Sequence, residues 1–127
     1  MESEAGKPVL NLAAVIVDCA DAGPVSAFYV AAAGATVIKR DADSAWISVG
    51  GVLVIFREVP DYRPTTWPGA DVPMQVHLDF AVEDMTAAEQ RLVELGATVP
   101  EFQAHRADGL VVLRDPAGHL FCIGPPV

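Results

Sequence analysis

The chain has 127 residues, of which 52% are hydrophobic and 20% are charged, and its formal net charge at pH 7 is −9. This length and composition predict one domain that folds around a single core without disulfides or metals. The acidic balance argues against nucleic acid or an anionic membrane surface as a partner, because their phosphates would be repelled.

The first segment, residues 1–9, is acidic and lacks the apolar centre of a signal peptide, so we expect a short disordered tail. No stretch of the sequence reaches the roughly 18 apolar residues of a membrane-spanning helix. Cys19 and Cys122 lie far apart and match no redox or metal-ligand spacing. We therefore expect two reduced thiols in a cytoplasmic protein, with a disulfide between them as the open alternative.

The first module is expected at residues 10–59. An apolar alternating run predicts a strand over 10–17, and Asp21 stands where the N-cap of a helix belongs. The helix is expected over 24–33, with Gly34 as its C-terminal stop. Three strands complete the module, at 35–40, 44–49 and 52–58.

Residues 60–75 form a connection whose four prolines, Pro60, Pro64, Pro68 and Pro73, exclude regular structure. Tyr62 and Trp67 within it are too apolar for a simple tether. Two interpretations stay open: these side chains pack over a sheet edge, or they form a wall over a binding cleft.

The second module, residues 76–127, repeats the first. The tetrapeptide Gly-Ala-Thr-Val occurs at 34–37 and again at 96–99, and an aspartate precedes each copy by 13 and 12 residues respectively, Asp21 and Asp84. A strand at 76–82 and a helix at 86–95 are expected to be followed by strands at 97–103, 110–114 and 119–124. Each half is therefore one βαβββ unit.

Alternation along the strands predicts which side chains face the helices. In the strand at 76–82, Leu78, Phe80 and Val82 should cover the helix, which leaves His77 and Asp79 on the opposite face. The same reasoning directs Phe56 and Phe121 inward and leaves Arg57 and Cys122 opposite. Trp46 is expected either on this opposite face or in the core.

The paired modules, the sequence Asp-Pro-Ala-Gly-His-Leu-Phe-Cys at 115–122 and the sequence His-Leu-Asp-Phe at 77–80 resemble the glyoxalase-like group of the vicinal oxygen chelate superfamily. That superfamily includes glyoxalases, bleomycin-resistance proteins and extradiol dioxygenases. The resemblance covers residues from about 12 to 123. It implies an α+β fold in which two tandem βαβββ modules form a curved, half-open eight-stranded barrel with the helices outside.

Enzymes of this superfamily bind a divalent metal through four strand positions, which correspond here to Ala14, Arg57, His77 and Cys122. Alanine has no donor atom, and a guanidinium stays positively charged and repels a cation. His77 and Cys122 would need a third ligand, for which Asp79 is the candidate, and Arg57 would weaken such a site. We therefore expect no metal cofactor, with a divalent metal as the less favoured alternative.

The function expected from the resemblance is metal-free binding, for sequestration or transport, of a small aromatic or amphipathic molecule. The expected ligand-binding residues lie on the concave face and in the connection: His77, Asp79, Arg57, Cys122, Trp46, Tyr62 and Trp67. Asp79 is expected to pair with Arg57. Two alternatives stay open: an enzyme of lyase, isomerase or dioxygenase type, or a non-catalytic accessory domain. A homodimer is expected in each case, since superfamily members are commonly dimers.

Overall fold

Each half of the chain starts with a strand that leads through a capping aspartate into a helix. The computed structural model describes residues 6–126. Asp21 accepts a hydrogen bond from Gly23 N at 3.1 Å, and Asp84 accepts one from Ala87 N at 3.0 Å. These bonds satisfy amide groups that the first helical turn leaves unpaired, which confirms both predicted N-caps. The elements are β1 (Val15–Cys19), α1 (Ala22–Ala33), β2 (Thr36–Arg40), β3 (Ser44–Val49), β4 (Val52–Glu58), β5 (Leu78–Ala81), α2 (Met85–Glu94), a 3-10 helix (Arg106–Asp108), β6 (Val111–Arg114) and β7 (Leu120–Gly124).

The strands form one sheet in each module. The first has the order β1-β4-β3-β2 and the second the order β5-β7-β6. The first and last strands of each module pair in parallel, β1 with β4 and β5 with β7, and the other pairs are antiparallel. The two sheets therefore repeat one topology, and the α+β class with two tandem modules is confirmed.

The prediction of a strand at 97–103 is wrong. Within residues 6–126 this segment contributes only a bridge between Thr98 and Arg114. Pro100 has no amide hydrogen for a ladder. The side chain of Gln103 takes over the pairing with β6: its amide donates to Val112 O at 2.8 Å, and its carbonyl accepts from Val112 N at 2.9 Å. The described part of the chain thus has seven strands, not eight.

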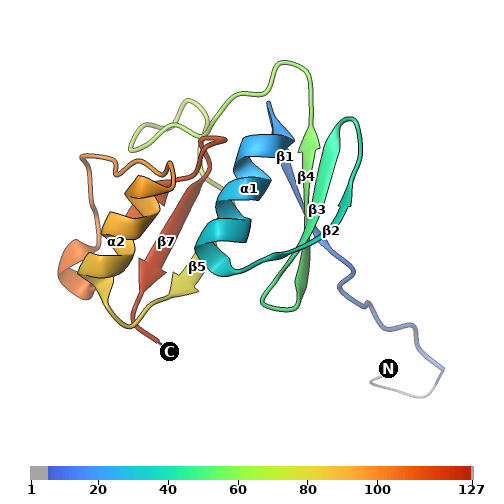
Figure 1. Ribbon diagram of the computed structural model, residues 1–127, viewed down its shortest axis with the longest axis horizontal. Coiled ribbons are helices and arrows are strands. Elements are labelled where there is room, and N and C mark those ends of the chain that lie inside the picture. Colours follow the sequence, from blue (N-terminus) through green and yellow to red (C-terminus); the bar gives the residue numbers. More distant parts are fainter. Residues whose placement is uncertain (1–5, 127) are drawn as a thin grey trace.

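The helix α1 packs against side chains of both sheets. Figure 1 shows α1 between the two sheets, while α2 covers the second sheet further out. The helix packs on β3 and β4, and its Phe28 and Tyr29 reach Phe121 of the second sheet, with ring centroids 5.8 and 6.1 Å apart. An apolar residue occupies nearly every position of α1, as is typical of a helix covered on several sides. One core therefore serves both modules.

The core residues are those that alternation predicts. Phe56, Phe121 and Ile123 are 1–2% exposed, and Leu78 and Phe80 are partly buried against them. No helix among the described residues is long and apolar enough to cross a membrane. Between β4 and β5 the chain forms no helix or strand and crosses from one module to the other along the upper edge in Figure 1.

A buried hydrogen bond joins the modules inside this core. The hydroxyl of Tyr29 donates to Asp115 Oδ2 at 2.7 Å, and Asp115 Oδ1 accepts from the backbone amides of Ala117 and His119. Asp115 is 5% exposed, and burial raises the pKa of its carboxyl group despite these bonds. The first helix and the β6–β7 turn are thereby held together by a buried polar contact.

Tyr29→Phe should lower the free energy of unfolding by about 1–3 kcal/mol, because it leaves a buried carboxylate oxygen without its donor. Urea denaturation followed by circular dichroism measures the change. Tyr62→Phe is the matched control and should cost less, since the Tyr62 side chain is only partly buried. Equal losses for the two variants would contradict the role given to the Tyr29–Asp115 bond.

Candidate functional site

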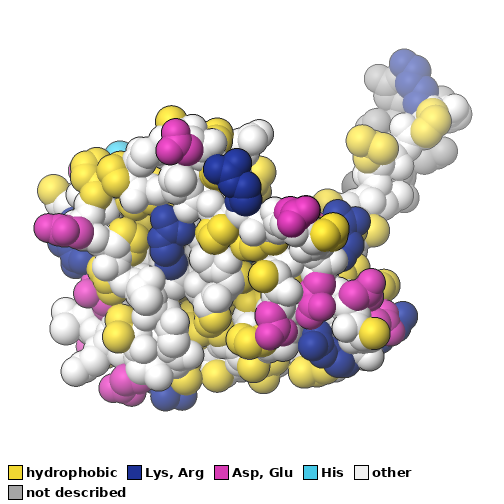
Figure 2. Space-filling model, turned by 90° about the horizontal axis from the view of Figure 1, so that it is seen from above, with side chains coloured by type: hydrophobic (Ala, Val, Ile, Leu, Met, Phe, Trp, Pro, Cys, Tyr) yellow, Lys and Arg dark blue, Asp and Glu magenta, His cyan; other side chains and the backbone are white. Residues whose placement is uncertain are grey.

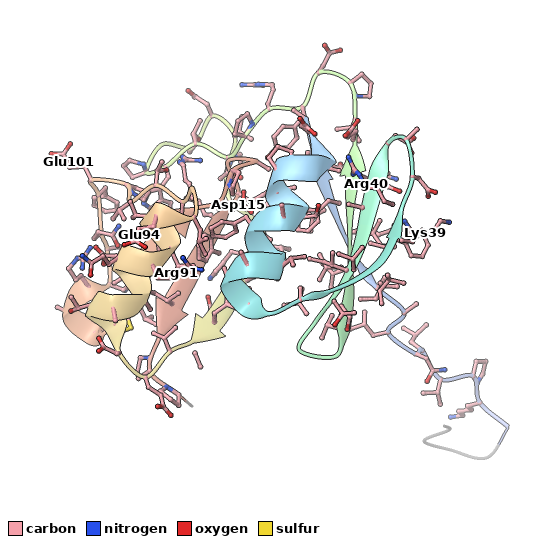
Figure 3. The ribbon with its side chains drawn as sticks, in the orientation of Figure 1. Lys39, Arg40, Arg91, Glu94, Glu101 and Asp115 are labelled. Atoms are coloured by element: carbon pink, nitrogen blue, oxygen red, sulfur yellow. The ribbon has the colours of Figure 1, made fainter. Side chains whose placement is uncertain are left out.

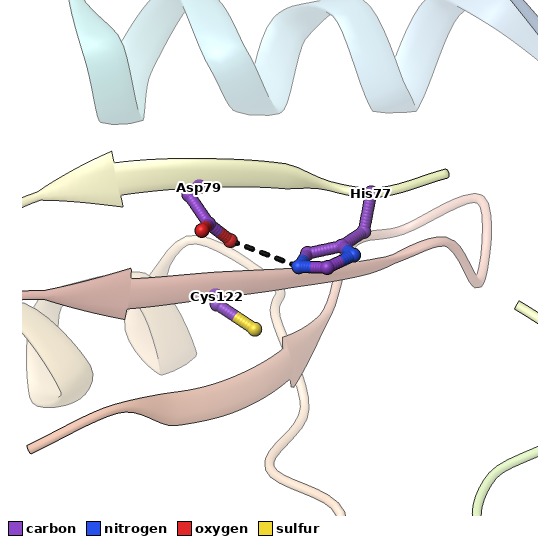
Figure 4. Close-up of side chains that lie close together, drawn as sticks. All are labelled: His77, Asp79 and Cys122. Carbon is purple, nitrogen blue, oxygen red and sulfur yellow. Dashed lines mark ion pairs between the residues drawn. The ribbon is translucent and has the colours of Figure 1, made fainter. Parts of the chain in front are cut away.

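Three side chains with metal-binding or acid–base chemistry lie together on the face of the second sheet that points away from α1. His77 Nε2 lies 3.0 Å from Asp79 Oδ1, and the ligand atoms of His77, Asp79 and Cys122 all lie within 4.8 Å of one another (Figure 4). The parallel register places Asp79 beside Cys122 on neighbouring strands. His77, Asp79 and Cys122 therefore lie on the sheet face opposite the side chains that cover the helices, as strand alternation predicts.

The Cys122 thiol is not a ready nucleophile. Burial raises its pKa above the ordinary value, and the charge and hydrogen bond of Asp79 raise it further. A thiol with a raised pKa stays protonated at neutral pH, whereas nucleophilic or metal-binding cysteines need the thiolate. The arrangement therefore favours a polar wall of hydrogen-bonding groups over a thiolate–imidazolium pair.

The sequence led us to expect that Arg57 pairs with Asp79. In the structure Arg57 pairs with Asp18 instead. Its Nη2 and Nε donate to Asp18 Oδ1 at 3.0 and 3.3 Å. The reason is register: Asp18 on β1 lies directly beside Arg57 on β4, while Asp79 belongs to the other sheet. Asp79 has His77 as its partner instead.

Trp46 lies on the open face of the first sheet, which is the face opposite the core. Its register partner on β4 is Ile55, while its neighbours in β3, Ala45 and Ile47, are buried in the core. The indole Nε1 donates to Ser44 Oγ at 3.1 Å, and Lys39 Nζ lies 4.8 Å from the ring centroid. Trp46 therefore has its own local partners and does not belong to the group around His77.

The largest hollow described lies between the modules, below the connection. This inter-module cleft has a volume of about 710 Å³ and is lined by β1, the start of β5, the β6–β7 turn and the connection. Its exposed surface is mostly apolar, but nine of the nineteen lining residues are polar or ionisable. The polar or ionisable residues that line it are Asp18, Tyr29, Asp61, Tyr62, Arg63, Gln75, His77, Asp115 and His119.

His119 and Tyr62 form a hydrogen-bonded pair in this wall. His119 Nε2 lies 2.6 Å from the backbone oxygen of Asp18 and 3.1 Å from the hydroxyl of Tyr62. A carbonyl only accepts, so Nε2 carries the hydrogen and donates it. Tyr62 can then only accept from His119, and its own hydroxyl hydrogen stays available to a ligand. Burial, followed by the charge of Asp115, raises the Tyr62 pKa to about 12, which keeps this hydroxyl protonated.

Sequence reasoning placed Tyr62 at the site but did not identify His119 as part of it. The position of His119 in the sequence could have indicated its role, because His119 directly follows the Asp-Pro-Ala-Gly turn at 115–118. In the structure this turn lies at the junction of the modules. Asp115 N binds His119 O at 2.9 Å, which closes the turn and fixes the ring beside β1.

Trp67 does not close over the cleft. Its indole Nε1 donates to Phe102 O at 3.0 Å, and the two rings lie 5.7 Å apart. It lines a separate, more open hollow together with Arg114 and Gly118. The connection therefore packs against the second module through Trp67 and faces the cleft through Tyr62. Trp67 has the packing role that the sequence left open, and Tyr62 forms part of the wall of the cleft.

The remaining reactive side chains lie outside this site. Cys19 is fully buried, and burial together with the charge of Glu58 raises its pKa to about 11, so it is an inert core thiol. Cys19 and Cys122 are both free. His105 is exposed and lies 3.5 Å from Asp108.

A two-module βαβββ fold with a polar cluster on the open sheet face defines the class of vicinal oxygen chelate proteins. The family model of the glyoxalase-like domain matches residues 14–124, and the chain belongs to that family. None of the curated protein sequences matches the chain.

Solved structures with the same fold include three at low sequence identity. The fosfomycin resistance protein FosX from Listeria monocytogenes is 17% identical, with a TM-score of 0.70 over 94% of this chain and 96% of that chain. A mutant of it complexed with Mn(II) and 1S,2S-dihydroxypropylphosphonic acid gives 17% and 0.71 over 94% and 93%. A possible glyoxalase from Bacillus cereus gives 17% and 0.68 over 91% and 99%. At these identities the likeness concerns the fold.

Proposed function

We propose that this glyoxalase-like protein binds a small molecule in the inter-module cleft without a metal ion. The observation that supports this most is the cleft itself, whose volume of about 710 Å³ lies within the range of ligand pockets. An apolar wall with a few convergent polar groups is the usual composition of such a site. His77, Tyr62 and His119 are the groups that would orient the ligand.

The hydrogen-bonding state of the wall indicates the ligand's chemistry. The hydroxyl of Tyr62 is a free donor, so the ligand carries an acceptor such as a carbonyl, ether or hydroxyl oxygen. Three aspartates, Asp18, Asp61 and Asp115, line the cleft against one arginine, Arg63, so the lining is net acidic and would oppose a full negative charge on the ligand. A neutral amphipathic molecule with an apolar body therefore fits this site best.

The case against a resident metal rests on the donors present. Ala14, the first expected ligand position, offers none, and Arg57 is a cation held by Asp18. The Cys122 thiol is soft and favours its protonated form, whereas Mn²⁺ prefers hard oxygen and nitrogen ligands. These residues do not fit the manganese ion that accompanies FosX in its complex.

The metal question has a direct test. The protein should purify without stoichiometric transition metal, and Mn²⁺, Ni²⁺ or Zn²⁺ should leave its melting temperature nearly unchanged. A metal that binds only the folded state at a hundred times its dissociation constant would add about 2.7 kcal/mol of stability. A rise of several degrees that His77→Ala abolishes would overturn the metal-free proposal.

A second candidate function is a metal-dependent, lyase-type enzyme. The observation in its favour is the cluster of His77, Asp79 and Cys122, whose ligand atoms lie within 4.8 Å. One imidazole, one carboxylate and one thiolate are a donor set for zinc with a fourth position left open. In that case His77, Asp79 and Cys122 would hold the ion, and the ion would polarise a substrate oxygen. Zinc retained after purification would favour this enzyme.

We also propose that the chain forms a homodimer in a reducing compartment such as the cytoplasm. Val37 and Ile38 on β2 are 61% and 56% exposed. β2 pairs only with β3 among the described strands and does not line the inter-module cleft, so it keeps a free edge. Light scattering should give the dimer mass, and Ile38→Asp should shift it toward the monomer. A monomeric wild-type protein would contradict this proposal and, with it, the dimeric accessory-domain reading.

The ligand is best sought by a thermal-shift screen of neutral aromatic and amphipathic metabolites. Trp46 and Trp67 do not line the cleft, so tryptophan fluorescence is the weaker probe. Tyr62→Phe and His77→Ala should weaken each hit by about tenfold, the effect of one lost hydrogen bond. His105→Ala, an exposed histidine outside the cleft, is the control and should leave affinity unchanged. Hits that neither cleft variant affects would move the site elsewhere.

A further inference from the structure

A second hollow lies on the other side of β5, between the two helices. It has a volume of about 290 Å³ and is bounded by α1, α2, β5 and β7. Phe80 and Tyr29 form part of its floor, with ring centroids 5.9 Å apart in a stacked arrangement. Ala32 of α1 and Ala88 of α2 form its sides, and their short side chains leave the space open. We call this hollow the helix groove.

The helix groove has one charged lining residue, Arg91. Figure 3 shows this side chain reaching from α2 into the space between α2 and α1, while Glu94 lies further out on the same helix. Among residues 6–126 no side chain forms an ion pair or hydrogen bond with the Arg91 guanidinium, in contrast to Arg106 of the same module, which pairs with Glu89 at 3.2 Å.

The composition of the helix groove differs from that of the inter-module cleft. Three aspartates line the cleft, whereas no carboxylate lines the helix groove. The charge at its mouth is therefore positive and the surface below it is aromatic and aliphatic. A guanidinium presents its N–H groups in a planar fork that matches the two oxygens of a carboxylate.

We infer that the helix groove binds a small organic acid, with its carboxylate on Arg91 and an apolar body over Phe80 and Tyr29. The volume of about 290 Å³ limits that body to a single aromatic ring or a short alkyl chain. The site is independent of the proposed function, because it lies on the helix side of β5, whereas His77 and Asp79 occupy the opposite side. The protein would thus hold two ligands of different charge.

The test uses phenylalkanoates from phenylacetate to 4-phenylbutyrate, each compared with the corresponding phenylalkanol, in titrations followed by amide chemical shifts. At least one acid should bind in the millimolar range or tighter and shift the amides of α1 and α2. Its alcohol should bind about tenfold or more weakly, since a charged hydrogen-bonded pair is lost. Arg91→Gln should weaken the acid by the same factor and leave the alcohol unchanged.

Two further variants complete the design. Ala32→Leu should abolish binding of both acid and alcohol while keeping the melting temperature, because it fills the helix groove without removing a contact. Arg106→Gln is the control that should leave acid and alcohol binding unchanged, and His77→Ala should leave the acid's affinity for the helix groove unchanged, since neither residue lines this hollow. The inference is overturned if no acid binds at millimolar concentration, if acid and alcohol bind equally, if Arg91→Gln leaves acid binding unchanged, or if binding depends on His77. Dependence on His77 would instead place the acid in the inter-module cleft.

Discussion

Phe121→Ala is expected to destabilise the protein by about 3–5 kcal/mol, the usual cost of removing a buried phenylalanine from a core. Phe121 is 2% exposed and lies within 6.1 Å, centroid to centroid, of the rings of Phe28, Tyr29 and Phe80. Two of those rings come from α1 of the first module and one from β5 of the second. The substitution therefore removes the side chain at which both modules meet.

Phe102→Ala is the matched control for this prediction. Phe102 is 47% exposed and contacts Trp67 on the surface, so its removal should cost about 1 kcal/mol. Chemical denaturation of both variants gives the two values. A loss for Phe121→Ala as small as that for Phe102→Ala would mean that the modules do not share one core.

Gly118→Ala should cost about 2–4 kcal/mol, because backbone strain and a steric clash add together. Gly118 has a φ of +88°, a conformation that alanine adopts only with strain, and a Cβ atom there would lie 2.7 Å from Pro64 Cβ. Pro64 belongs to the connection two residues after Tyr62. The added methyl group should therefore displace the segment that covers the inter-module cleft and weaken ligand binding as well.

Gly34→Ala separates the two contributions. Gly34 ends α1 with a φ of +64°, but a Cβ atom there would have no neighbour within 4 Å. It should cost about 1–2 kcal/mol from the left-handed conformation alone and leave ligand affinity unchanged. If Gly118→Ala were no worse than Gly34→Ala, the connection would not be seated against the β6–β7 turn.

The local structure was predictable because it depends on short-range signals. The aspartate caps, the glycine after α1 and the alternation in β4, β5 and β7 each act within a few residues, and most observed elements begin and end within about two residues of those expected. The strand expected at 10–17 is wrong at its start, because β1 spans Val15–Cys19 and residues 10–14 form no strand. The other exception is the segment at 97–103, where Gln103 replaces backbone pairing by side-chain hydrogen bonds. A side chain that pairs with a strand nine residues away leaves no periodic signal.

The site was predictable only in part, because its geometry depends on register and on the packing of the modules. Alternation places His77, Asp79 and Cys122 on one face. It does not state which strand residues are neighbours, so it could not show that Arg57 lies beside Asp18. The meeting of Tyr62 with His119, 57 residues apart, follows from the path of the connection over the junction. Figure 2, which looks onto the molecule from the connection side, shows apolar side chains between separate acidic and basic ones there and no continuous basic patch.

Amide chemical-shift mapping of a screened neutral ligand, in protein treated with a chelator, tests the central claim most directly. Saturable binding should persist without metal, and the largest shifts should fall on Tyr62, His77 and His119 around the inter-module cleft. Binding that disappears with the chelator and returns with zinc would contradict the claim and favour the metal-dependent enzyme. Shifts confined to residues outside the cleft would contradict it as well.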